Sequence, residues 1–265
     1  MKLSFKIIFD RAIGSQAMKN LTKSLIVALL CLAGSLNAQT TPIASNLIDL
    51  NSTEGDQLLF ASSTRTDYIP LSIEFITQEN LAYCGVASIV MILNALDIPA
   101  PETPEYRNLF RIFTQDNVFD QPQTRQVIAP ETVARQGMTL QELGGLLASY
   151  PVDVTVRHGA DMTLEEFRRV IVDNLSEADN YVLVNYLRRS LGQKGGGHIS
   201  PIAAFHEESD RLLILDVARY RYAPIWVKVE DLWQATNTLD TTSNKTRGLV
   251  LVSGQETGLT ESKTD

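Results

Sequence analysis

The chain has 265 residues, 44% hydrophobic and 20% charged, which suits a globular protein of one medium-sized domain or two small ones. Its formal net charge is −8, and no run of basic residues offsets that charge locally. Nucleic acid and anionic lipid are therefore excluded as expected partners.

The first 38 residues have the order of a secretory signal peptide. Lys19 and Lys23 precede an apolar run over residues 25–33, and small residues follow it. The run is shorter than the roughly 18 apolar residues of a membrane span. We therefore expect residues 1–38 to direct export, to the periplasm, and to leave no membrane attachment after cleavage. Met18 is an alternative start of the chain.

Polar stretches flank the expected folded domain. Residues 39–65 are rich in Thr, Ser, Asn and Asp and predict a tether with at most a short strand. Residues 255–265 are polar and predict a flexible tail. The folded domain is therefore expected to span residues 66–254.

Cys84 opens the most apolar segment of this domain. The other cysteine lies inside the expected signal peptide, so the mature chain cannot form an internal disulfide. Residues 86–96 are apolar nearly all round, which predicts a helix buried on every side. Pro99 and Pro101 would end that helix.

The rest of the N-terminal half of the domain is also predicted to be helical. We expect a second helix over residues 104–115. Two more helices should begin at capping boxes, in which a threonine is followed three residues later by a glutamate. These boxes are Thr139 with Glu142 and Thr163 with Glu166.

The second half contains short β-rich runs separated by turn signals. These runs are YVLVNYL, HISPIAAF, RLLILDVARY, APIWVKV and RGLVLVS. Because helices come first and strands afterwards, the expected fold class is α+β, with a helical N-terminal half and an antiparallel sheet in the C-terminal half.

Three residues have the types and order that thiol acyl-transfer chemistry requires. Cys84 stands at a helix N-terminus, where positive potential favours the thiolate. His198 follows three glycines, and Asp216 ends an apolar run. The carboxylate can hold one ring nitrogen of the histidine while the other faces the thiol. We therefore predict a nucleophile, a general acid–base and an orienting group.

Two further residues complete this candidate site. Gln78 could donate its amide N–H to a developing oxyanion, together with the backbone N–H of Cys84. Gly85 has no side chain, so a substrate backbone could approach the thiol closely.

Each of these residues also has a purely structural interpretation. Cys84 could be buried packing, His198 a strand-end residue, and Asp216 a turn former. The remaining histidines, His158 and His206, are read as surface polar residues. No CxxC or HxxxH spacing occurs, so no protein-bound metal and no cofactor are expected.

Taken together, the segments resemble the phytochelatin synthase family, whose catalytic domain is papain-like. The resemblance covers residues from about 70 to 253. It is carried by AYCGVASIVMILNALDIP, FTQDN, GMTLQEL, NYLRRSLGQKGGGHISPIAAFHEESDRLLILDVARYRYAPIWV and TLDTTSNKTRGLVLVS.

The resemblance implies that glutathione and γ-glutamyl peptides are the substrates. Cys84 would cleave the Cys–Gly bond of glutathione through a γ-glutamylcysteinyl thioester, and glycine would leave. Water or a second glutathione would then take the acyl group. Asn185, Asp240 and Arg247 match polar positions of the family motif and would bind the charged γ-glutamyl head.

One departure from the family pattern bears on the expected product. Plant and yeast members continue into a cysteine-rich domain, which is not matched here, so the chain resembles short prokaryotic members that favour hydrolysis. Cadmium or zinc would act as a thiolate complex of glutathione. A homodimer is left open as the assembly. The alternatives are a cysteine peptidase for other short peptides and a non-catalytic exported module that binds thiols or metals.

Overall fold

The computed structural model describes residues 41–104, 107 and 109–255. The expected signal peptide over residues 1–38 lies outside the described residues, as does the expected tail beyond residue 255. Within the described ranges, no helix combines the length and the apolar character needed to cross a membrane.

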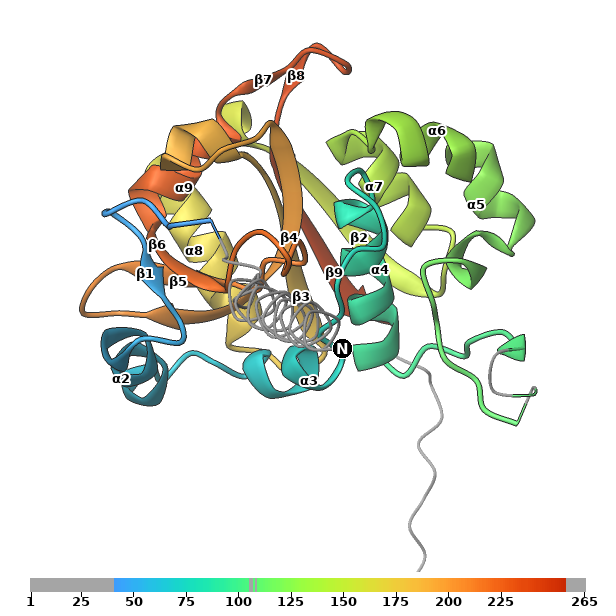
Figure 1. The fold of residues 1–265 in the computed structure, drawn as a ribbon, viewed down its shortest axis with the longest axis horizontal. Helices are drawn as coiled ribbons and strands as arrows, with labels where there is room; N and C mark the ends of the chain where they lie inside the picture. The colour runs from blue at the N-terminus through green and yellow to red at the C-terminus, as the bar shows by residue number, and fades with distance from the viewer. Residues whose placement is uncertain (1–40, 105–106, 108, 256–265) are drawn as a thin grey trace, which may run out of the picture. The chain divides into compact units, whose positions relative to one another are not determined.

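The described chain is built on one antiparallel sheet of seven strands, in the order β1-β6-β5-β4-β3-β9-β2 (Figure 1). The strands are β1 (Ile48–Asp49), β2 (Val152–His158), β3 (Asn180–Leu187), β4 (Gly197–His206), β5 (Arg211–Ile214), β6 (Ile225–Lys228) and β9 (Gly248–Gly254). A separate small hairpin consists of β7 (Leu239–Asp240) and β8 (Lys245–Thr246).

Helices cover both faces of this sheet and bury one apolar cluster on each (Figure 1). The helices are α2 (Thr53–Ala61), α3 (Tyr68–Ile73), α4 (Cys84–Ala95), α5 (Pro122–Val127), α6 (Pro130–Gln136), α7 (Leu140–Leu147), α8 (Leu164–Leu175) and α9 (Val229–Thr236). Short 3₁₀ turns are η2 (Asn117–Phe119), η3 (Gly159–Asp161) and η4 (Arg188–Leu191). α3, α4 and α7 contribute to one cluster, and α8 and α9 contribute to the other. The predicted α+β class is confirmed.

The buried cysteine helix is also confirmed. α4 begins at Cys84, and every residue from Gly85 to Leu93 is buried. A Cβ built on Gly85 would lie 2.6 Å from the sulfur of Met138, so only glycine fits there without displacing that side chain. Close packing at this point holds the first turn of α4 against the segment between α6 and α7.

Both capping boxes form as predicted. Thr139 caps α7 with Glu142, and Thr163 caps α8 with Glu166, each by reciprocal side-chain and backbone hydrogen bonds. These helices therefore begin where local sequence alone placed them.

The helix expected over residues 104–115 is wrong for the described part of this stretch. Glu102 and Arg111 pair instead as an isolated β-bridge. The side chain of Asn94 exchanges two hydrogen bonds with the backbone of Phe113, at 2.9 and 3.1 Å. Long-range partners thus satisfy backbone groups that a helix would otherwise have paired internally.

The tether expected over residues 39–65 is wrong for residues 41–65. β1 pairs with β6 at the sheet edge, and Ser52 caps α2 through a 3.0 Å bond from the N–H of Gly55. The indole of Trp226 donates to the carbonyl of Gly55 over 3.1 Å. A few buried apolar residues, Leu47 and Leu59 among them, are enough to fold this otherwise polar segment onto the sheet.

The separation of helices and strands along the chain is less complete than expected. β2 lies in the helical half and pairs with β9 over its full length, while α9 lies in the strand half. In β2, Val154 and Val156 pack against the core and alternate with more exposed residues. The alternation of apolar and polar residues was therefore present in the sequence, but the strand forms through its pairing with β9.

Candidate active site

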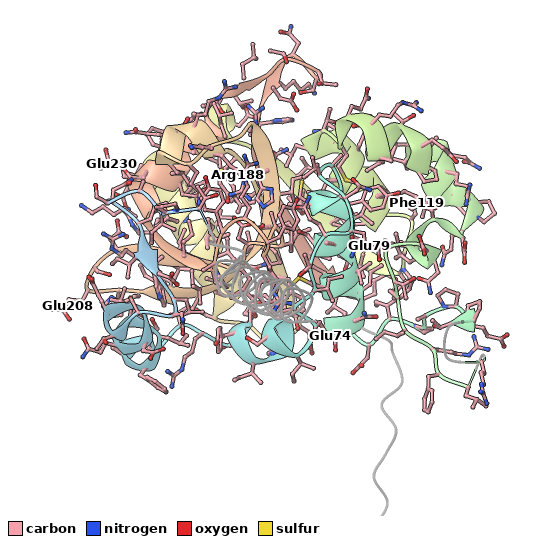
Figure 2. All side chains as sticks on the ribbon, in the orientation of Figure 1. Glu74, Glu79, Phe119, Arg188, Glu208 and Glu230 are labelled. Carbon is pink, nitrogen blue, oxygen red and sulfur yellow. The ribbon has the colours of Figure 1, made fainter. Side chains whose placement is uncertain are left out.

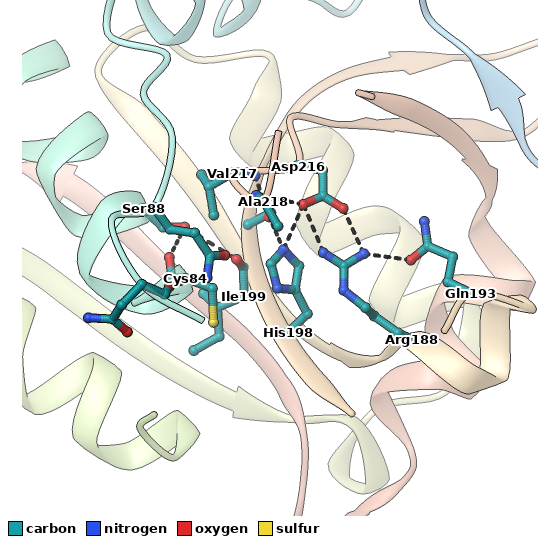
Figure 3. Close-up of polar contacts among 12 residues, drawn as sticks. Cys84, Ser88, Arg188, Gln193, His198, Ile199, Asp216, Val217 and Ala218 are labelled. Carbon is teal, nitrogen blue, oxygen red and sulfur yellow. Dashed lines mark hydrogen bonds and ion pairs between the residues drawn. The ribbon is translucent and has the colours of Figure 1, made fainter. Parts of the chain in front are cut away.

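Cys84 and His198 lie side by side, although they come from opposite halves of the chain (Figure 3). The first turn of α4 carries the cysteine, and the start of β4 carries the histidine. Burial, the largest single influence, would raise the pKa of the Cys84 thiol, whereas the hydrogen bond and the positive charge of His198 lower it. The backbone N–H of Ile199 and the charge of Arg188 act in the same direction, so the thiol pKa is lowered. The thiolate is therefore favoured.

The second ring nitrogen of His198 is held on the side away from the thiol. Nε2 lies 2.9 Å from Oδ1 of Asp216 and 3.0 Å from the hydroxyl of Ser200. Burial, the largest influence, lowers the pKa of the His198 imidazole, and the charge of Arg188 lowers it further. The charge and hydrogen bond of Asp216, together with the hydrogen bond to Cys84, outweigh these effects, and the net pKa is raised. Because Nε2 is engaged in this way, Nδ1 is left to face Cys84.

Arg188 completes the group and was missed by the sequence analysis. Its guanidinium donates to both carboxylate oxygens of Asp216, at 2.7 and 2.8 Å, and all atoms of this pair are buried. Burial would raise the pKa of Asp216, but the charges of His198 and Arg188 hold it well below its usual range. Arg188 is buried and is labelled near the middle of the view in Figure 2, whereas Glu208 and Glu230 lie at the edge of that view.

Further contacts fix the guanidinium and the imidazole in place. Arg188 also donates to the side-chain oxygen of Gln193 over 2.8 Å, and it lies 4.9 Å above the ring of Tyr222. Tyr186 pairs in register with His198 and meets its ring edge-on, with centroids 5.7 Å apart. Both functional side chains therefore have few alternative positions.

No signal in the sequence separates Arg188 from its neighbour Arg189. Both directly follow a buried strand, and only the 3₁₀ turn η4 decides that Arg188 points inward while Arg189 is exposed. A bidentate partner for Asp216 could have been anticipated on chemical grounds, but its position could not.

Gln78 lies near this group, next to the segment after β5 that carries Asp216. Its backbone N–H donates to the carbonyl of Val217 over 3.0 Å. Its buried side-chain amide donates to the carbonyl of Asn80 over 2.5 Å, and Oε1 has no partner among the described residues. One amide hydrogen is therefore still available, and the oxyanion role of Gln78 stays a prediction.

A pocket of about 740 Å³ opens beside the thiol. Five of the predicted site residues line it, namely Cys84, Asn185, His198, Asp240 and Arg247. Gln78, Gly85 and Asp216 are not among its lining residues. Gly85 packs against Met138, and its contact with substrate stays a prediction.

The residues predicted to bind a charged head come together in this pocket. Arg247 is mostly buried and donates to the carbonyl of Leu239 over 2.8 Å, directly before Asp240. Burial lowers the pKa of Arg247, the negative charge of Asp240 partly offsets this, and the positive charge of Arg189 lowers it further. A Cβ on Gly197 would lie 3.2 Å from the guanidinium, which explains why a glycine precedes His198.

Two further observations concern the remaining histidines and metal binding. His206 was expected at the surface but is buried, with Nδ1 2.8 Å from the hydroxyl of Ser209. Tight packing of β4 draws it inward despite the acidic turn that follows. Within the described ranges, no three His, Cys, Asp or Glu side chains gather in a way that could hold a metal ion.

The arrangement can carry out nucleophilic chemistry on a carbonyl group. A thiolate at a helix N-terminus faces an imidazole that can take up or release a proton, and a buried carboxylate orients that imidazole. The adjacent pocket contains both a carboxylate and a guanidinium, so it suits a ligand that carries both charges.

Comparison with known proteins identifies the family. A family model described as phytochelatin synthase matches residues 38–249. Glutathione gamma-glutamylcysteinyltransferase 3 of Lotus japonicus is 32% identical over 209 residues, which are 78% of this chain and 42% of that protein. Glutathione gamma-glutamylcysteinyltransferase 1 of Arabidopsis thaliana is 32% identical over 210 residues, 78% of this chain and 41% of that protein.

The chain thus spans about two fifths of the length of these plant relatives. Among solved structures, xylellain, a cysteine protease from Xylella fastidiosa, is similar over 84% of this chain and 93% of its own. Its sequence identity is 9% and its TM-score 0.39, which is too low to establish a common fold. The match of the family model over most of the chain shows that this protein belongs to the phytochelatin synthase family.

Proposed function

We propose that this protein is a glutathione γ-glutamylcysteinyltransferase that also hydrolyses the acyl-enzyme. The single observation that carries this proposal is one pocket lined by Cys84 and His198 together with Asn185, Asp240 and Arg247. The names of the plant relatives support glutathione as the substrate class.

In the first step, the Cys84 thiolate attacks the carbonyl carbon between cysteine and glycine of glutathione. A carbon–sulfur bond forms, the carbon–nitrogen bond breaks, and His198 gives its proton to the departing amine. The products are free glycine and a γ-glutamylcysteinyl thioester on Cys84. Asp216 keeps the imidazole oriented through its 2.9 Å contact with Nε2.

The negative charge on the carbonyl oxygen needs hydrogen-bond donors in the transition state. The backbone N–H of Cys84 at the start of α4 is one donor, and the remaining amide hydrogen of Gln78 is the other. Removing one such donor typically lowers kcat by about 100- to 1,000-fold.

The charged γ-glutamyl head is the basis of substrate selection. Asp240 would bind its ammonium group and Arg247 its carboxylate, while Asn185 on β3 would add a hydrogen bond. A peptidase without this selectivity would have no need of both charges in one pocket. This supports γ-glutamyl peptides over other short peptides.

In the second step, His198 removes a proton from the acceptor that attacks the thioester. With water, γ-glutamylcysteine is released; with the amine of a second glutathione, a phytochelatin forms. We propose hydrolysis as the favoured outcome, as the resemblance to short prokaryotic members implies. Cadmium or zinc would enter as a thiolate complex of the substrate.

The test is to incubate purified protein with glutathione, with and without cadmium, and to follow glycine, γ-glutamylcysteine and longer products by mass spectrometry. Cys84→Ala and His198→Ala should abolish glycine release. His206→Ala is the matched control, because His206 is equally buried but outside the pocket, and it should retain activity. Absence of glycine release by the unmodified protein would refute the proposal.

Export and assembly are separate proposals that rest on the sequence. We propose that residues 1–38 direct the protein to the periplasm, which cell fractionation of the full chain would test. Sedimentation velocity of the purified protein would distinguish a monomer from a homodimer.

A further inference from the structure

Arg135 belongs to the part of the pocket lining that comes from α6 and the segment after it, whereas the β7–β8 hairpin provides another part. Arg135 lies in the last turn of α6, and in Figure 1 α6 (green) lies on one side of the start of α4 while β7 and β8 (orange to red) lie on the other. Arg135 is exposed, lines the pocket, and forms no ion pair with any described residue. Its charge is therefore available to a ligand.

The chain that follows Arg135 packs directly against the residues around the thiol. A Cβ on Gly137 would lie 3.6 Å from the carbonyl of Ala82, and Met138 contacts Gly85. Arg135 and Cys84 both line this pocket, so their side chains face one common space. The guanidinium can therefore approach a group bound just beyond the thiol.

The charges of the pocket point to an anionic ligand. Its lining includes Arg135, Arg189 and Arg247 against two carboxylates, those of Glu142 and Asp240. The Glu142 carboxylate already accepts bonds from the capping threonine at 2.7 and 2.8 Å. The pocket thus carries surplus positive charge although the whole chain has a net charge of −8.

The proposed substrate has one charge that the γ-glutamyl site leaves unmatched. Asp240 and Arg247 together neutralise the ammonium and carboxylate of the γ-glutamyl head. The remaining charge is the carboxylate of the departing glycine, one residue beyond the carbonyl that Cys84 attacks. Arg189 lies near Arg247, since its charge lowers the pKa of that residue, whereas Arg135 belongs to α6, which Figure 1 shows on the other side of the start of α4 from the β7–β8 hairpin.

We propose that Arg135 binds the free carboxylate of the departing residue. This inference rests on the proposed function and extends it, because it defines the substrate class as peptides with exactly one residue after the scissile bond. Amidated or longer peptides would lack a carboxylate at the position that Arg135 reaches. The site would then release single amino acids and leave internal peptide bonds intact.

The test compares glutathione with its glycinamide analogue, which has the same size but lacks one negative charge. The unmodified protein should cleave glutathione with a kcat/KM about 10- to 100-fold higher, the typical range for one charge-assisted hydrogen bond. Arg135→Gln should lower kcat/KM for glutathione to the level of the amide and leave the amide unchanged. Arg169→Gln, an exposed arginine on α8 outside the pocket, is the matched control and should keep the preference.

The outcomes separate this inference from the proposed function. If the unmodified protein cleaves both substrates equally well, the carboxylate site is refuted while the proposed function stands. If it cleaves neither, the proposed function itself fails. If Arg189→Gln abolishes the preference and Arg135→Gln does not, the assignment to Arg135 is overturned.

Discussion

Replacing Arg188 by methionine tests whether the buried ion pair holds the site together. The variant removes both hydrogen bonds to Asp216 and leaves a carboxylate in a side chain that is 0% exposed. Breaking a buried pair from one side typically costs about 3–5 kcal/mol, because the remaining charge is uncompensated. We expect Arg188→Met to lower the free energy of unfolding by that amount.

The chain offers a matched control at its surface. Arg168 binds Asp210 through two hydrogen bonds of 2.8 Å, but these side chains are 25% and 40% exposed. Because water screens this pair, Arg168→Met should cost at most about 1 kcal/mol. Urea unfolding of both variants, followed by fluorescence and with unchanged m-values, measures the difference. Equal losses in the two variants would contradict the argument from burial.

The loss in Arg188→Met should depend on pH in a defined direction. The pKa of Asp216 in the folded protein is lowered, so its contribution to stability is present above the unfolded value of about 3.9 and is lost as pH falls through the folded value. Without Arg188 the folded pKa rises and the contribution shrinks. The difference in the free energy of unfolding between the variant and the unmodified protein should therefore be largest near pH 7 and should decrease below pH 4. Urea unfolding across this pH range would measure it.

Three other predictions follow from the structure. The rate at which iodoacetamide alkylates Cys84 should rise with pH around a midpoint below the ordinary cysteine pKa of about 8.5. His198→Ala should move this midpoint to a higher pH. Identical midpoints in the two proteins would contradict the pairing of Cys84 with His198. Gly85→Ala should cost about 1–3 kcal/mol in urea unfolding by overpacking, and adding Met138→Ala should recover part of that loss. Burial first, and a neighbouring carboxylate second, raise the pKa of Asp67 to about 8, so stability falls as pH rises between the unfolded value and that value. Asp67→Asn should accordingly be more stable than the unmodified protein at pH 9 and similar to it at pH 4.

Local features of the sequence were sufficient for several elements. The capping boxes at Thr139 and Thr163 predicted the starts of α7 and α8, because a cap is a contact among four consecutive residues. The continuous apolar run after Cys84 predicted a buried helix, and the β-rich runs predicted the central strands. Where only long-range contacts set the structure, prediction was wrong, as for residues 41–65 and the described part of residues 104–115.

The candidate site likewise contains residues that the sequence predicted and contacts that only the structure shows. Residue types and order along the chain were enough to select Cys84, His198 and Asp216, because thiol chemistry needs those groups and few others were available. Only the tertiary structure decided that Arg188 turns inward to Asp216 and that Gly85 packs against Met138. The physical reason is that the direction of a side chain at a turn depends on the elements packed around it. The local sequence of two adjacent arginines therefore does not indicate which one contacts a buried carboxylate.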